Sequence, residues 1–101
     1  MTTPASAAAV GTDSGRPGFG TVTPYLMVAS LTGTLALLEK AFGAVETFRE
    51  RGSAGGWHVE VQIGNSRIML GESKAVPSML FVYVADTDAV YGAALAAGAA
   101  P

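Results

Sequence analysis

The sequence predicts an α+β fold in which one βαβββ module is followed by a second, partial βα module in a mixed sheet. Three observations carry this prediction: a strictly alternating segment that leads into a two-residue turn, two segments that begin at helix-capping residues, and an internal repeat. In the repeat, residues 25–30 align with residues 81–86, which gives a period of 56 residues.

The first predicted strand and helix occupy residues 21–43. Residues 21–28 form a strand in this interpretation because apolar residues recur at alternate positions, and Pro24 favours an edge or early position. Ser30 is suited to cap the start of a helix, and Gly43 stands where a glycine ends one. Four apolar residues recur at helical spacing between these caps: Leu31, Leu35, Leu38 and Phe42.

A hairpin is the most informative part of the chain. Residues 44–51 are predicted to form a strand and the glycine-rich residues 52–56 a loop, after which Trp57–Ile63 alternates apolar and polar residues strictly. Gly64 and Asn65 then offer a two-residue turn with glycine first, as a type II′ turn requires. The turn predicts this register: Ile63 faces Ser66, Gln62 faces Arg67, Val61 faces Ile68, Glu60 faces Met69 and Val59 faces Leu70.

The end of the chain repeats the strand and helix of its beginning. Residues 79–85 are predicted to form a strand, with Leu80, Val82 and Val84 on one side and Met79, Phe81 and Tyr83 on the other. Asp86 then caps a second helix, which Gly98 ends. The first module continues through three further strands, whereas the second stops after its helix.

The composition describes one small domain and excludes several classes of function. The chain of 101 residues has a net charge of −2, no cysteine and one histidine, His58. These counts exclude disulfides, thiol nucleophiles, iron–sulfur clusters and, within one copy, a zinc site with several histidines. No basic excess suggests duplex nucleic acid as a partner, and no apolar run reaches the roughly 18 residues of a membrane span.

The two ends of the sequence differ in their potential to fold. Residues 1–20 are rich in small residues, glycine and proline, and we expect a disordered tail without a secretory signal, followed by one domain over residues 21–101. We therefore expect a cytoplasmic protein. Charged residues make up only 14% of the chain, against about 25% in an average domain, which favours extra burial at an oligomer interface.

The ordered set of elements resembles the vicinal oxygen chelate superfamily, which includes glyoxalase I, bleomycin-resistance proteins and extradiol dioxygenases. The segments VTPYLMV, LEKAFGA, WHVEVQIGNSRIML and FVYVADTDAVYGAALAAGA carry the resemblance, which covers residues 21–101. It implies a sheet curved around a cavity, with helices on the outer face. Because the second module lacks its last three strands, it also implies a fragment, a natural truncation, or a homodimer in which another copy completes the sheet.

The resemblance also locates the metal ligands of the superfamily's metalloenzymes. They lie on the first strand, the fourth strand and the first strand of the second module, where this sequence has Thr23, Met69 and Met79. Threonine and methionine do not form a hard site of the nickel, zinc or iron kind. We therefore predict neither a metal nor another cofactor.

The two faces of the predicted sheet differ in character. One face is apolar and would pack on the helices: Leu26, Val28, Val59, Val61, Ile68, Leu70, Val82 and Val84. The other would line the cavity and bind substrate: Tyr25, Met27, His58, Glu60, Gln62, Arg67, Met69, Phe81 and Tyr83. Alternatively, this second face is solvated or forms a dimer interface, and Glu60 pairs only with Arg67.

The leading functional prediction is a glyoxalase/bleomycin-resistance-like protein that binds a small organic molecule without a metal, in a cavity completed by dimerisation. Tyr25, Phe81 and Tyr83 would supply stacking surface. A second hypothesis is a metal-dependent lyase, isomerase or dioxygenase, which requires His58 and Glu60 of two chains to converge on one ion. A third is a non-catalytic, truncated interaction fragment.

Overall fold

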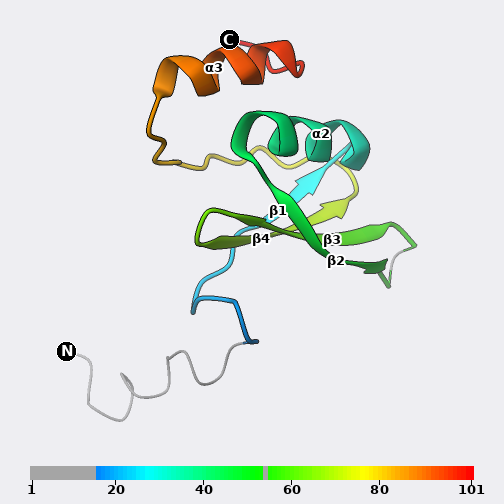
Figure 1. The fold of residues 1–101 in the computed structure, drawn as a ribbon. Helices are drawn as coiled ribbons and strands as arrows, with labels where there is room; N and C mark the ends of the chain where they lie inside the picture. Colours follow the sequence, from blue (N-terminus) through cyan, green and yellow to red (C-terminus); the bar gives the residue numbers. More distant parts are fainter. Residues whose placement is uncertain (1–15, 54) are drawn as a thin grey trace, which may run out of the picture.

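A computed structural model describes residues 16–53 and 55–101, and these residues form the predicted α+β fold (Figure 1). Its elements are β1 (Tyr25–Val28), α2 (Leu31–Phe42), β2 (Val45–Arg51), β3 (Trp57–Ile63), β4 (Ser66–Glu72) and α3 (Thr87–Ala96). The strands make one curved, mixed sheet in the order β1-β4-β3-β2, in which β1 is parallel to β4 and the other pairs are antiparallel. The predicted βαβββ module is confirmed.

The β3–β4 hairpin has the predicted register along its whole length. Ile63 pairs with Ser66 next to the turn, and Val59 pairs with Leu70 near the other end. Gly64 has a φ of 54°, and within the described residues only glycines have positive φ. A positive φ at Gly64, the first turn residue, and a negative φ at Asn65, the second, agree with a type II′ turn.

Helix α2 starts and ends at the predicted residues and covers one face of the sheet. The Ser30 hydroxyl accepts a hydrogen bond from the Gly33 N–H at 3.2 Å, and Gly43 is left-handed with a φ of 67°. Figure 1 shows α2 between the sheet and α3. The core lies between α2 and the sheet and consists of Leu31, Leu35, Leu38, Ala44, Val59, Val61, Ile68 and Leu70.

The prediction of a strand at residues 79–85 is wrong. Figure 1 shows this segment as an extended loop, and no strand of the described chain pairs with it. A strand is defined by a ladder of backbone hydrogen bonds to a neighbour, and alternation of side chains predicts only their direction. The side chains do alternate in direction as predicted. Leu80 and Val82 line a hollow against α2 and α3. The side chains at the alternate positions are exposed to solvent: Met79 at 95%, Phe81 at 84% and Tyr83 at 92%.

The remaining boundaries differ in smaller ways. Strand β1 begins at Tyr25 rather than at residue 21, although the Pro24 carbonyl already accepts a hydrogen bond from the Met69 N–H at 3.0 Å. Asp86 caps α3 as predicted, through a bond from the Ala89 N–H at 3.0 Å, and Gly98 follows its end. Neither helix of the described ranges is both long and apolar enough to cross a bilayer.

Candidate functional site

The sheet face opposite α2 carries most of the predicted binding residues, and we call it the polar face. Two rows of residues run across the four strands on this face. The first row is Tyr25, Met69, Glu60 and Phe48, and the second is Met27, Gly71, His58 and Glu50. Gln62 and Arg67 lie beyond the first row, toward the hairpin turn. Side chains from distant parts of the sequence therefore share one surface.

A chain of hydrogen bonds links three of these side chains. His58 Nε2 lies 2.8 Å from Glu60 Oε2, and Tyr25 Oη lies 3.1 Å from His58 Nδ1. Because a carboxylate only accepts, the Nε2–H donates to Glu60, and the Nδ1 of a neutral ring then accepts from the Tyr25 hydroxyl. The Tyr25 and His58 rings are 5.5 Å apart between centroids. The arrangement fixes the orientation of both rings.

Gly71 makes the contact between Tyr25 and His58 possible. It lies on β4 between Met27 of β1 and His58 of β3 in the second row. A Cβ atom at this position would come within 2.8 Å of Tyr25 Oη and 3.1 Å of its Cε1. Without that atom, the tyrosine ring leans across β4 and reaches the histidine.

Glu60 is the buried charge at the centre of the face. It is 0% exposed, and both of its carboxylate oxygens accept hydrogen bonds from Arg16, at 2.7 and 2.9 Å. The Arg16 side chain is 54% exposed, so the guanidinium covers the carboxylate from the solvent side. The bonds from Arg16, and secondarily those from His58, hold the pKa of Glu60 below its ordinary value, although burial acts in the opposite direction.

Arg16 and Phe19 reach the polar face through a tight turn that our sequence interpretation missed. The Phe19 N–H donates to the Arg16 carbonyl at 3.0 Å, and Gly18 has a φ of 86°. Proline followed by a left-handed glycine is typical of a type II turn, so Pro17-Gly18 was a signal in the sequence. Residues 1–15 of the predicted tail lie outside the described residues, whereas Arg16 and Phe19 contact the sheet.

Two aromatic rings lie close to the guanidinium group of Arg16. Its Cζ atom lies 4.6 Å from the centroid of the Phe19 ring and 5.6 Å from that of Phe48. Arg67 lies over the same Phe19 ring, with its Cζ 5.1 Å from the centroid. The two cation–π contacts of Arg16, with Phe19 and Phe48, help to hold its guanidinium beside Glu60.

The predicted pairing of Glu60 with Arg67 is wrong. Arg67 donates instead to the side chain of Gln62, its direct partner across the hairpin, and to Thr47 Oγ1 at 3.4 Å. The register of β2 shifts between Glu46 and Phe48, next to Thr47, whose hydroxyl also donates to the Glu60 carbonyl at 3.2 Å. Arg67 thus has acceptors near the turn, and Arg16 takes the carboxylate.

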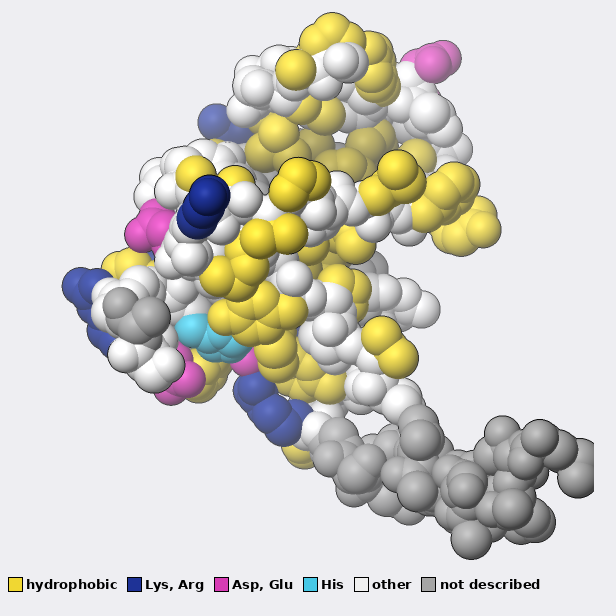
Figure 2. All heavy atoms as spheres, turned by 180° about the vertical axis from the view of Figure 1, so that it is seen from behind, with side chains coloured by type: hydrophobic (Ala, Val, Ile, Leu, Met, Phe, Trp, Pro, Cys, Tyr) yellow, Lys and Arg dark blue, Asp and Glu magenta, His cyan; other side chains and the backbone are white. Residues whose placement is uncertain are grey.

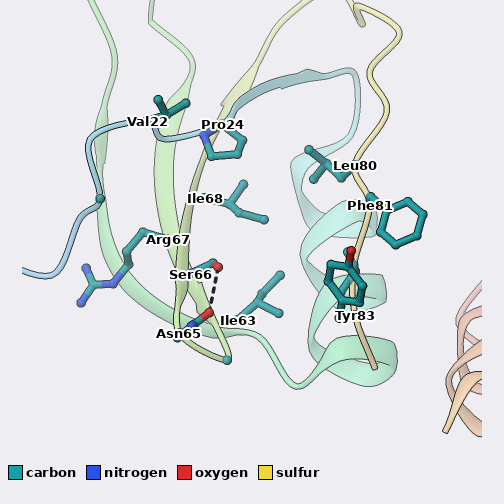
Figure 3. A pocket seen from close by; sticks show the side chains of 13 residues that line it. Val22, Pro24, Ile63, Asn65, Ser66, Arg67, Ile68, Leu80, Phe81 and Tyr83 are labelled. Atoms are coloured by element: carbon teal, nitrogen blue, oxygen red, sulfur yellow. Dashed lines mark hydrogen bonds between the residues drawn. The ribbon is translucent and has the colours of Figure 1, made fainter. Parts of the chain in front are cut away.

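The structure divides the nine predicted binding residues between two places. Phe81 and Tyr83 lie on the extended segment after β4 and border a hollow of about 510 Å³ between this segment and the hairpin turn. Figure 3 shows Ile63, Ile68 and Leu80 pointing into this hollow, whereas Phe81 points away from it. The other seven lie on the polar face: Tyr25, Met27, His58, Glu60, Gln62, Arg67 and Met69. Figure 2 shows the histidine, in cyan, reaching the surface beside hydrophobic and basic side chains.

The polar face does not fit a divalent metal. Thr23 and Met69 provide no hard anionic donor, and Met79 lies outside the sheet and is 95% exposed. Both oxygens of Glu60 are already hydrogen-bonded. In residues 16–53 and 55–101, no three His, Cys, Asp or Glu side chains come together as a metal site would require.

Comparison with known proteins establishes the fold. The sequence matches no family model and no curated protein. The structure is similar to the crystal structure of FosX, a genomically encoded fosfomycin resistance protein from Listeria monocytogenes, in complex with Mn(II) and sulfate. The TM-score is 0.60 at 19% sequence identity, and the match covers 84% of this chain and 72% of the FosX chain. This likeness shows a shared glyoxalase-type fold.

Proposed function

We propose that this chain is a glyoxalase/bleomycin-resistance-like member of the vicinal oxygen chelate superfamily that binds a small organic molecule on the polar face without a metal. The observation that carries the proposal is the hydrogen-bonded series Tyr25–His58–Glu60, which ends in a fully buried carboxylate on a sheet face that neither α2 nor α3, the helices of the described residues, covers. The fold shared with FosX supports the choice of superfamily. Function depends on the site rather than on the fold, so the residues of the polar face decide which ligand binds.

Recognition explains the polar face better than stability does. A buried ion pair contributes little net stability, because removing both charges from water offsets their attraction. Small-molecule sites, by contrast, combine aromatic and apolar walls with a few convergent polar groups. The polar face has this composition, with Tyr25, Met69 and Phe48 in one row around Glu60.

Replacing Tyr25 with alanine is expected to weaken ligand binding about tenfold, the equivalent of roughly 1.4 kcal/mol. The substitution removes an aromatic wall and the partner of His58 Nδ1. A fragment screen by NMR identifies a ligand of the wild-type protein, and calorimetry then gives its Kd for each variant. Tyr91→Ala is the matched control, since Tyr91 lies on α3 and is 54% exposed, close to the 49% of Tyr25. Equal losses in the two variants would contradict the proposed site.

The proposal includes a homodimer in which a second copy covers the extended segment after β4. Phe81 and Tyr83 are almost fully exposed there and have no neighbouring strand within the described chain. Large exposed apolar side chains beside unpaired backbone favour association. A partner at this position would bring Phe81 and Tyr83 into an enclosed cavity, which is the environment that the sequence predicts for them.

Sedimentation velocity is expected to give the mass of two chains for the wild-type protein. Phe81→Asp should shift the mass toward one chain, because it places a charge in the apolar contact. Val45→Asp serves as the control, since Val45 is also exposed, at 61%, but lies on β2 at the other edge of the sheet. A single-chain mass for the wild-type protein, or equal dissociation by both variants, would contradict this arrangement.

A further inference from the structure

The polar face presents its buried carboxylate without a cationic partner from the sheet itself. Arg67 is the arginine of the neighbouring strand on this face, and it is bonded to Gln62 and Thr47. His58 contacts only one of the two Glu60 oxygens. The cation that covers both oxygens, Arg16, comes from a segment that precedes the sheet by several residues.

The contact of this segment with the sheet consists of side-chain interactions. Within the described residues, the hydrogen bonds that join residues 16–23 to the rest of the chain are the two from Arg16 to Glu60. Phe19 adds stacking contacts with Arg16 and Arg67. Gly18 lies close to the Arg67 guanidinium, because a Cβ atom added to Gly18 would be 3.0 Å from Arg67 Nη2. A ligand that reproduces the Arg16 contacts can replace them without breaking a strand pairing.

We infer that the ligand of the polar face is a planar cation of the guanidinium or amidinium type, which binds Glu60 in place of Arg16. The inference rests on the proposed function and names the chemical class of its ligand. A planar cation with two parallel N–H groups matches the two Glu60 oxygens as Arg16 does, and Phe48 provides an aromatic wall 5.6 Å from that cation position. An aromatic or apolar body on the ligand would extend along Tyr25 and Met69.

Arg16 acts in this inference as an intramolecular competitor of the ligand. The apparent Kd of a site that is open for only a fraction of the time is raised by the inverse of that fraction. If Arg16 closes the site nine-tenths of the time, its removal lowers the apparent Kd about tenfold. The type II turn at Pro17-Gly18 keeps Arg16 and Phe19 together, so that both groups leave or return as a unit.

The test compares benzamidine, benzamide and benzoate as probes of the full chain. Benzamide has the shape of benzamidine without its charge, and benzoate has the opposite charge. We expect Arg16→Gln to bind benzamidine at least about tenfold more tightly than the wild type by calorimetry. Arg49→Gln, which removes an exposed arginine paired with Glu46, should bind like the wild type. Adding Glu60→Gln to Arg16→Gln should abolish the gain.

The outcomes distinguish a failure of the inferred ligand class from a failure of the proposed binding site. A folded Arg16→Gln variant that gains no benzamidine affinity overturns the inference, and so does an equal gain for benzamide. Binding of benzamide or benzoate alone on the polar face would leave the proposed function standing with another ligand class. If Arg16→Gln does not fold, the Arg16 Nε–H signal of the wild-type protein is followed by NMR during a benzamidine titration. A signal that does not move at saturation overturns the inference.

Discussion

Leu70→Ala is expected to lower the free energy of unfolding by roughly 2–5 kcal/mol, the range for truncating a fully buried leucine. Leu70 is 0% exposed, lies on the internal strand β4, and belongs to the core between the sheet and α2. The loss combines the transfer of the side chain to water with the cavity left behind. Since small domains have a stability of about 5–15 kcal/mol in total, this single change should remove a large share of it.

Urea unfolding monitored through the single tryptophan, Trp57, measures this effect. The midpoint should fall while the slope of free energy against urea stays constant, because the surface exposed on unfolding changes little. Val45→Ala is the control, an apolar truncation at a residue that is 61% exposed on β2. Its effect should stay within about 0.5 kcal/mol. Equal decreases in the free energy of unfolding for Leu70→Ala and Val45→Ala would contradict the position of the core between the sheet and α2.

Glu60→Gln is expected to destabilise the protein at neutral pH by about 1.5–3 kcal/mol, the range for a hydrogen bond to a charged group. A glutamine side chain has only one oxygen that can accept a hydrogen bond from Arg16. Its amide N–H₂ would face the other N–H donor of Arg16, so one of the two hydrogen bonds is lost. The loss should depend on pH. The folded protein lowers the pKa of Glu60 below its ordinary value of 4.5, so the carboxylate stabilises the fold above that value.

The difference between wild type and Glu60→Gln should therefore shrink as the pH falls below 4.5 and through the folded pKa of Glu60. Urea unfolding at a series of pH values between neutral and acid measures this difference. Glu39→Gln is the control, because Glu39 is an exposed carboxylate on α2, and it should follow the wild type throughout. A gap that stays constant with pH would mean that Glu60 is not ionised and paired in the folded protein.

The secondary structure that could be predicted correctly from the sequence depends on interactions between residues close together in the chain. The Gly64-Asn65 turn and the period of two fixed the register of β3 and β4, because a slip of one residue would move every apolar side chain to the polar face. Ser30, Gly43 and Asp86 fixed helix ends, because each satisfies backbone groups that the adjoining helix leaves free. The same alternation is sufficient to place His58, Glu60 and Gln62 on one face, since alternate side chains of a strand point to the same side.

The tertiary structure alone decided which groups meet on that face. Tyr25 of β1 reaches His58 of β3 because β4 lies between these two strands and has Gly71, with no side chain, at the point of crossing. Arg16 and Glu60 form their ion pair although 44 positions of sequence separate them. No local pattern encodes such contacts, since they depend on where separate segments lie in space. For the same reason residues 79–85 alternate like a strand without being one. Alternation is a property of the segment, whereas a strand needs a neighbour, which the described part of this chain does not supply.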